Sequence, residues 1–194
     1  MNKRGKTIAM LVGLSAIVII GAILLYYSPS WIANLRIGSV ENHPNYAGTL
    51  EIPSVNISLP CLDANNADLA KDAVDAPNCG ARIYYPYPHA VGGTEDPETY
   101  MIVDHDYQGF KEIRKCVPQD MAFFHHKGGE TTQYKVVCAF EGYISKDNEL
   151  LDDKGQSFWK CVPQNLLLVT CHPSANVDAP ISSRRLFVYL EPVS

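Results

Sequence analysis

The chain has 194 residues, of which 46% are hydrophobic and 19% charged, and its formal net charge is −5. This length fits one domain of ordinary size with an additional segment. The negative charge and the lack of any basic block interleaved with aromatic residues argue against nucleic-acid binding, so we expect no nucleic-acid partner.

The first segment is predicted to anchor the chain in a membrane. Residues 7–27 are uncharged and almost wholly apolar, which matches the roughly 20 residues that cross a bilayer. Three basic residues precede this run and aromatic residues close it, which favours a cytoplasmic N-terminus. We expect a single-pass protein of the cell membrane, with a cytoplasmic tail at 1–6, a signal-anchor at 7–27, a linker at 28–47 and an extracellular domain at 48–194.

Short segments with strand character dominate the expected extracellular domain. The predicted strands are residues 49–53, 55–60, 82–87, 99–103, 121–126, 132–145 and 185–190. A helix is predicted over residues 64–74 with Asp63 as its N-cap, and a helical turn over 110–115. Residues 146–160 are a predicted loop. This pattern indicates a mainly β domain, folded as a small closed or half-closed barrel.

One further strand carries the most informative residue. An apolar run from Leu166 to Val169 is followed by Thr170, Cys171 and, two residues later, Pro173. A charge-free aliphatic run is typical of a strand buried on both faces, and the strand should stop before the proline. Cys171 is therefore predicted at the C-terminal end of a core strand. Most free cysteines are simply buried, so a nucleophilic role depends on a partner.

A histidine is the expected partner, because a nucleophilic cysteine needs a nearby base or cation that favours its thiolate. Of the six histidines, His105 alone shares the predicted position of Cys171, at the end of an apolar strand. His172 adjoins Cys171 in extended chain and should point the other way. The remaining histidines adjoin prolines or lie within a strand: His43, His89, His125 and His126.

All six cysteines lie outside the predicted membrane span, and no C-x-x-C motif is present. Neither a thioredoxin-type redox site nor a zinc knuckle is therefore indicated. Disulfides are compatible with an extracellular domain, and Cys116 and Cys161 stand in nearly identical hexapeptides. If Cys171 stays a thiol, an odd number remains, which argues against a complete disulfide framework. The pairing among the other five stays open: Cys61, Cys79, Cys116, Cys138 and Cys161.

Four motifs stand in order along the chain: Gly48-x-Leu50-x-Ile52-Pro53, Ile102-Val103-Asp104-His105, Leu167-Leu168-Val169-Thr170-Cys171 and Arg185-Leu186-Phe187-Val188. In this order and at these spacings they resemble the motifs of the sortases, membrane-anchored cysteine transpeptidases of Gram-positive bacteria. The resemblance covers about residues 48–192. It implies an eight-stranded sortase-type β-barrel with one or two short helices, preceded by the N-terminal transmembrane helix.

The resemblance also implies a reaction. Cys171 would attack a C-terminal sorting motif of the LPxTG kind in a surface protein, His105 would act as acid and then base, and an arginine would bind the peptide or the oxyanion. The acyl group would pass to an amine of a peptidoglycan precursor or a pilin lysine. Two alternatives remain open: a hydrolytic cysteine peptidase, and a catalytically silent sortase-like module that binds sorting peptides or assists assembly.

Two arginines compete for the third role. Alternation along the last predicted strand turns its aliphatic side chains into the barrel and puts Arg185 on the other face. The aliphatic residues are Leu186, Val188 and Leu190, and the residues that share the face of Arg185 are Phe187 and Tyr189. We choose Arg185. Arg184 is the alternative, because a bulge at the start of the strand would reverse the register.

The sequence departs from the family pattern at Asp104, where glycine is usual, and at Leu167, where threonine is usual. Asp104 and Asp106 flank His105, and carboxylates beside a histidine favour its imidazolium. Asp104 and Thr170 are the predicted supporting residues.

No cofactor or metal is expected. Some sortases use calcium, and two acidic stretches resemble a calcium-binding pair of loops, although solvated loop charges explain them more simply. The stretches contain Glu95, Asp96 and Glu98, and Asp147, Glu149, Asp152 and Asp153.

Overall fold

The computed structural model describes residues 33, 35–64, 66–84, 100–144, 150–156, 166–171 and 184–193, without the side chains of residues 84, 144, 150 and 171. The predicted cytoplasmic tail and the predicted membrane span lie outside these residues, as do residues 28–32 and 34 of the predicted linker. Within the described part of the chain, no helix is both long and apolar enough to cross a bilayer.

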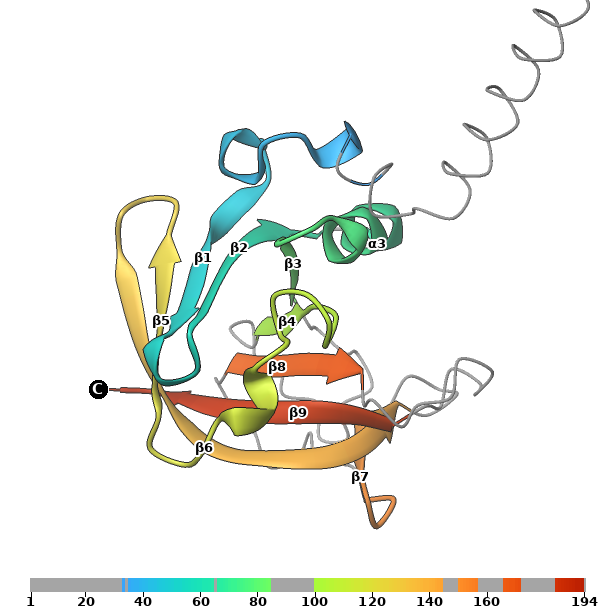
Figure 1. Cartoon of the computed structure of the whole chain (residues 1–194), viewed down its shortest axis with the longest axis vertical. Helices are drawn as coiled ribbons and strands as arrows, with labels where there is room; N and C mark the ends of the chain where they lie inside the picture. Colours follow the sequence, from blue (N-terminus) through green and yellow to red (C-terminus); the bar gives the residue numbers. More distant parts are fainter. Residues whose placement is uncertain are drawn as a thin grey trace, which may run out of the picture.

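The described residues form nine strands: β1 (Tyr46–Ile52), β2 (Ile57–Asp63), β3 (Gly80–Tyr84), β4 (Tyr100–Val103), β5 (Met121–His126), β6 (Thr131–Ile144), β7 (Leu150–Asp152), β8 (Leu166–Cys171) and β9 (Arg184–Pro192). Their order in the sheet is β5-β1-β2-β3-β4-β8-β9-β6-β7, and β5 also pairs with β6. The β5–β6 pairing closes eight strands into a barrel, and β7 extends from β6 outside the ring (Figure 1). The predicted eight-stranded barrel is confirmed.

The predicted helix is present as α3 (Ala67–Asp75), but its N-cap is Asn66 and not Asp63. The Asn66 side chain accepts the N–H of Leu69 at 2.8 Å, which satisfies one of the free donors of the first turn. Asp63 ends β2, where its Oδ1 lies 2.6 Å from Nε of Arg82 on β3. The N-cap prediction is wrong because this ion pair joins residue 63 to the neighbouring strand.

Two strand predictions need correction. Strand β2 continues through Pro60 to Asp63, although proline lacks the N–H of a strand ladder. Pairing with β3 begins only at Cys61, so β2 tolerates a proline one residue earlier. The second correction is β7, which lies within the predicted loop 146–160 and pairs with β6. Short 3-10 turns complete the elements: η1 (Val40–Asn42), η2 (Pro53–Val55) and η3 (Ile113–Lys115).

The barrel interior is filled by aliphatic and aromatic side chains from all parts of the domain. Those of β9 are Leu186, Val188 and Leu190, so the predicted inward face of this strand is confirmed. A second apolar cluster covers the opposite face of β4, β8 and β9, and we call it the outer-face cluster: Met101, Leu167, Val169, Phe187 and Tyr189. Strand β8 is therefore buried on both faces, and burial of each large side chain contributes about 1.5–3 kcal/mol to stability. This packing gives the end of β8 a rigid support.

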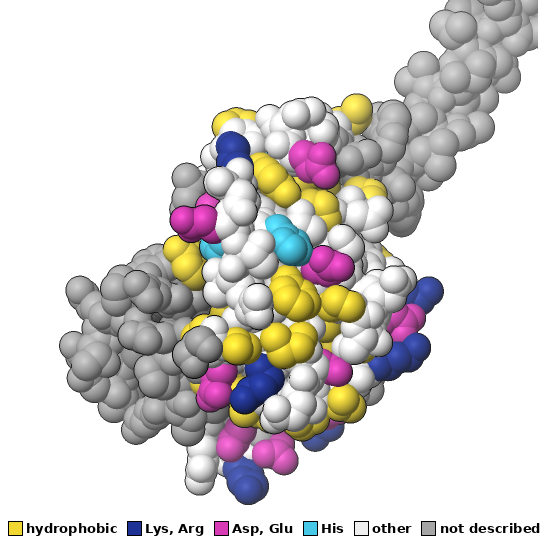
Figure 2. Space-filling model, turned by 90° about the vertical axis from the view of Figure 1, so that its left-hand side faces the viewer, with side chains coloured by type: hydrophobic (Ala, Val, Ile, Leu, Met, Phe, Trp, Pro, Cys, Tyr) yellow, Lys and Arg dark blue, Asp and Glu magenta, His cyan; other side chains and the backbone are white. Residues whose placement is uncertain are grey.

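A third cluster lies between α3 and the barrel. The helix packs through Ala73 and Ala76 against Leu62 and Ala81 of β2 and β3. Figure 1 shows α3 beside these strands, at the side of the barrel where β4 also lies. Seen from the side of β5, the surface carries acidic and basic side chains interspersed with apolar ones (Figure 2).

Candidate active site

Strands β4 and β8 run parallel and side by side, so their C-terminal ends meet at one end of the barrel. Val103 pairs with Val169, and His105 and Cys171 each stand two residues further along the chain. On the other side of β8, Cys171 pairs with Arg185 of the antiparallel strand β9. The three residues predicted from the sequence thus stand together at the ends of three adjacent segments.

Strand alternation separates this group from the barrel interior. Position 171 has the same parity as Leu167 and Val169 of the outer-face cluster, and paired residues of neighbouring strands share a face. Arg185 therefore belongs to the outer face. Thr170 lies on the other side of β8, where it is 1% exposed, and its Oγ1 has no hydrogen-bond partner among the described residues.

The ring of His105 lies between a carboxylate and an aromatic ring. Its Nε2 is 3.5 Å from Oδ1 of Asp75, the last residue of α3, and both side chains are mostly buried. The Tyr107 ring stacks on it, with the centroids 4.7 Å apart. Sequence reasoning missed Asp75. The available signal was an acidic residue at the C-terminal end of a helix, where the helix dipole disfavours a negative charge.

Asp104 contacts the backbone of His105 instead of its ring. The residue is 1% exposed, and its Oδ1 accepts the His105 N–H at 2.7 Å. Burial raises the pKa of Asp104 to about 7, against the opposing effect of the backbone N–H groups of His105, Gly109 and Phe110. The other flanking carboxylate, Asp106, lies 3.8 Å from Nη2 of Arg114. Among the three carboxylates, Asp75 is the one within ion-pair distance of the imidazole.

The two candidate arginines differ in their surroundings. Arg184 is paired with Tyr143 in the β6–β9 register, and its Nη1 lies 3.5 Å from Oε2 of Glu141. Arg185 is half-buried, and its Nη1 donates to the carbonyl oxygen of Arg184 at 3.2 Å. Its pairing with Cys171 makes Arg185 the arginine adjacent to the end of β8.

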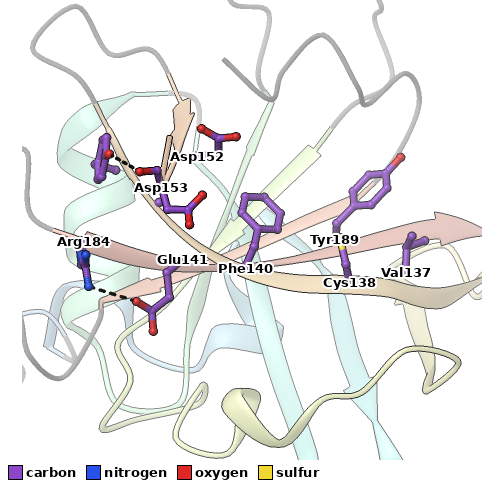
Figure 3. Close-up of a pocket in the computed structure, with 10 residues that line it drawn as sticks. Val137, Cys138, Phe140, Glu141, Asp152, Asp153, Arg184 and Tyr189 are labelled. Atoms are coloured by element: carbon purple, nitrogen blue, oxygen red, sulfur yellow. Dashed lines mark hydrogen bonds and ion pairs between the residues drawn. The ribbon is translucent and has the colours of Figure 1, made fainter. Parts of the chain in front are cut away.

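A cavity of about 710 Å³ opens between β6, β7 and β9. Figure 3 shows acidic residues at one end of it, Phe140 in the middle, and Tyr189 with Val137 at the other end. Phe140 stacks on Phe187 with ring centroids 5.4 Å apart, so the cavity adjoins the outer-face cluster. Its described lining residues are Val137, Cys138, Phe140, Glu141, Gly142, Tyr143, Asp152, Asp153, Arg184 and Tyr189.

Gly142 lies in a tightly packed position at the acidic end of this cavity. It pairs with Arg185 on one side and with Asp152 on the other. A Cβ at this position would lie 2.3 Å from the carbonyl oxygen of Leu151 and 3.1 Å from the Phe187 ring. Only glycine fits between these groups.

Four other cysteines are described, and all are free thiols. Cys61, Cys79 and Cys116 are buried, and Cys138 is exposed. Burial raises the pKa of Cys79 to about 12 and that of Cys116 to about 11, and it raises the pKa of Cys61 further. These buried thiols resist conversion to the reactive thiolate. Cys161 lies outside the described residues, so the structure does not test a disulfide between it and any of these cysteines.

The described residues contain no group of three His, Cys, Asp or Glu side chains arranged to hold a metal ion. Of the acidic stretches compared with calcium-binding loops, only Asp152 and Asp153 are described. Oδ1 of Asp152 accepts the N–H groups of Lys154 and Gln156 at 2.9 and 2.8 Å, which gives this carboxylate a structural role in the turn after β7. The other members lie outside the described residues.

Comparison with known proteins gives a family match. A family model described as a sortase domain matches residues 50–193. A lid mutant of sortase A from Corynebacterium diphtheriae aligns with a TM-score of 0.50 and 20% identity, over 78% of this chain and 71% of that chain. Sortase C2 of pilus island 1 from Group B Streptococcus gives a TM-score of 0.50 and 18% identity, over 78% and 76% of the two chains.

A third solved structure is sortase C from Clostridium perfringens with the C-terminal cell wall sorting motif. It aligns with a TM-score of 0.49 and 21% identity, over 77% of this chain and 71% of that chain. Among curated proteins, no sequence match is found.

Proposed function

Because the chain belongs to the sortase family, we propose that it is a cysteine transpeptidase with Cys171 as its nucleophile. The observation that carries this proposal is the strand register, in which Val103 pairs with Val169 and Cys171 pairs with Arg185. This register brings a histidine, a cysteine and an arginine to one end of the barrel from distant parts of the sequence. The raised pKa values of the three buried cysteines further favour Cys171.

The proposed reaction has two steps. The Cys171 thiolate attacks a peptide carbonyl, the C–N bond breaks, and the leaving amine takes a proton from His105. A second amine then gives a proton to His105 and attacks the thioester, which releases the thiolate. Arg185 donates hydrogen bonds to the developing oxyanion or to the bound peptide. The thiol, imidazole and guanidinium supply all of this chemistry, so the proposed reaction uses no cofactor.

The proposed substrate is a C-terminal sorting motif of the LPxTG kind in a surface protein. The cavity beside Arg184 supports this proposal, because its apolar and acidic lining offers an extended peptide both packing and polar contacts. We propose an amine of a peptidoglycan precursor or a pilin lysine as the acceptor.

We further propose that residues 7–27 hold the enzyme in the cell membrane, with the barrel outside the cell. The uncharged apolar run and the basic residues before it support this orientation. An extracellular position would give the active site access to secreted substrates and to cell-wall amines.

A peptide assay tests the proposed activity. The purified full chain is incubated with a panel of quenched fluorogenic peptides that carry different sorting motifs, with and without an amine, and products are identified by mass spectrometry. We expect cleavage within one motif and, when the amine is present, a product in which the amine is joined to the new C-terminus.

The same assay separates the alternatives. Cleavage with a free carboxyl product alone, even at high amine concentration, would indicate a hydrolytic peptidase. Saturable binding of a peptide with no cleavage would indicate a silent sortase-like module.

Substitution by lysine tests the choice between the two arginines. Lysine keeps the positive charge but loses the planar fork of donors. We expect Arg185→Lys to lower kcat/KM by about 100-fold, the size of effect seen when an oxyanion donor is removed. Arg184→Lys is the matched control and should change kcat by less than about threefold, because it keeps the charge that pairs with Glu141. Any loss should appear in KM, because Arg184 lines the cavity proposed to bind the peptide. A reversed result would show that Arg184 serves the reaction.

A further inference from the structure

The carboxylate of Asp75 is shared between two cationic partners. Its Oδ1 faces Nε2 of His105 at 3.5 Å, and its Oδ2 contacts the ammonium of Lys71, one helical turn earlier in α3. Lys71 is largely exposed, whereas His105 and Asp75 are both mostly buried. The interaction of the carboxylate with His105 is therefore the better shielded from water.

One face of the His105 ring is also occupied. Tyr107 stacks on it with the ring planes inclined by 14°. The carboxylate and the aromatic ring together restrict rotation of the imidazole. A ring held in this way can present its second nitrogen in one direction only.

We propose that Asp75 is a positioning residue for His105, which holds the imidazole in one orientation through the direct contact between its carboxylate and Nε2 of the ring. The proposal deepens the proposed function, since it concerns the residue proposed to protonate the leaving amine. Nothing in the sequence pattern assigns Asp75 this task, because it arises from a contact between α3 and the segment after β4.

Helix stability does not account for Asp75. It is the last residue of α3, where the negative end of the helix dipole disfavours a carboxylate. Asp75 also forms an ion pair with Lys71, four residues earlier. An ion pair in which the lysine precedes the acid stabilises a helix less than one in which the acid comes first. A residue that opposes local helix preference is expected where another contact requires it.

The charged and titratable groups around His105 come from several elements. Asp75 lies on α3 and contacts the ring directly, whereas Lys71, also on α3, contacts Asp75. Tyr107 follows His105 in the same loop, and Cys171 is the last residue of the neighbouring strand β8. Asp104 and Asp106 are engaged elsewhere, by the His105 backbone and by Arg114. The direct electrostatic contact of the imidazole within the described residues is therefore the one with Asp75.

The primary experiment follows protonation of the His105 ring by NMR in the full chain, with His105→Gln used to assign the resonance. We expect Asp75→Asn to move the titration midpoint to lower pH, because the ring then loses the opposite charge that lies 3.5 Å from its Nε2. Lys71→Met should move the midpoint the opposite way, because the carboxylate then has a single cationic partner. Asp75→Glu should restore part of the wild-type value.

Asp72→Asn is the matched control. Asp72 lies on the same helix, is equally exposed, and forms an ion pair with Arg36. The Asp72→Asn substitution should leave the His105 titration midpoint within about 0.2 unit of wild type. The acidic limb of the kcat/KM profile should follow the NMR midpoint in each variant.

An unchanged midpoint in folded Asp75→Asn, or shifts of one sign in both Asp75→Asn and Lys71→Met, would overturn the proposal. Equal shifts in Asp72→Asn and Asp75→Asn would also overturn it, because they would reflect net charge alone. The NMR titration needs no substrate. If the His105 midpoint shifts as expected but the protein cleaves no peptide, the positioning role of Asp75 would be supported. Such a result would count against the proposed function alone.

Discussion

Replacing Cys171 with alanine is expected to lower turnover of a sorting peptide by at least about a thousand-fold, because removal of a covalent nucleophile leaves only the residual catalysis of the surrounding site. The barrel should remain folded. Residue 171 is the last residue of β8, whereas the packing of the strand comes from Leu166 to Val169, which are almost completely buried. The measurements are kcat/KM for the peptide, together with circular dichroism and thermal unfolding of both proteins.

Cys138→Ala is the matched control, because Cys138 is the exposed thiol among the other described cysteines. The Cys138→Ala variant should retain kcat within about twofold of wild type, and any effect should appear in KM, because Cys138 lines the cavity proposed to bind the peptide. Iodoacetamide provides a second test, since the thiol that reacts in parallel with loss of activity should be found by peptide mapping at residue 171. Full activity in Cys171→Ala, or inactivation that follows labelling of Cys138, would contradict the assignment.

Replacing Asp104 with asparagine is expected to stabilise the domain at neutral and alkaline pH by roughly 4 kcal/mol. The side chain is buried, and burial raises its pKa from 3.8 to about 7. Between these values the folded protein binds a proton that the unfolded chain has released. Stability of the wild type therefore falls as pH rises from about 4 to about 7, and it levels off above that range.

The neutral amide removes this pH dependence while keeping an oxygen that can accept the His105 N–H. The difference between Asp104→Asn and wild type should be small below pH 4, grow through pH 5 and 6, and become constant above about pH 7. Urea unfolding at several pH values measures it. Asp106→Asn is the control, because Asp106 is an acidic neighbour that pairs with Arg114. Parallel stability curves for wild type and Asp104→Asn would contradict a buried carboxyl that keeps its proton.

The packing around Asp104 explains why its carboxyl is so strongly affected. Its Oδ2 is buried and lacks a hydrogen-bond partner among the described residues. Gly109 approaches so closely that a Cβ there would lie 2.4 Å from Oδ2. Thr170 follows Val169, the β8 residue that pairs with Val103, and its side chain is likewise buried, on the face of β8 that points into the barrel. Asp104, predicted as a support for His105, is thus enclosed beneath the candidate site.

The sequence by itself determined the features that repeat along the chain. Alternation with a period of two identified the inward face of β9, because burial of every second residue is a local property of a strand. A continuous aliphatic run without charge identified β8 as a strand buried on both faces. The proline after Cys171 indicated where β8 ends. The order of four motifs pointed to the family that the domain match then identified.

Only the tertiary structure decided which distant residues meet. Closure of the barrel depends on the pairing of β1 with β5 and of β4 with β8, and no local pattern specifies neighbours that lie so far apart in the sequence. The N-cap moved to Asn66 because Asp63 pairs with Arg82 across two strands. The sequence of α3 distinguished Asp75 only by its unfavourable position at the C-terminal end of the helix. Its contact with His105 exists because α3 packs beside the end of β4. Ion pairs of this kind depend on distances of a few ångströms between separate elements, and packing of the whole domain sets those distances.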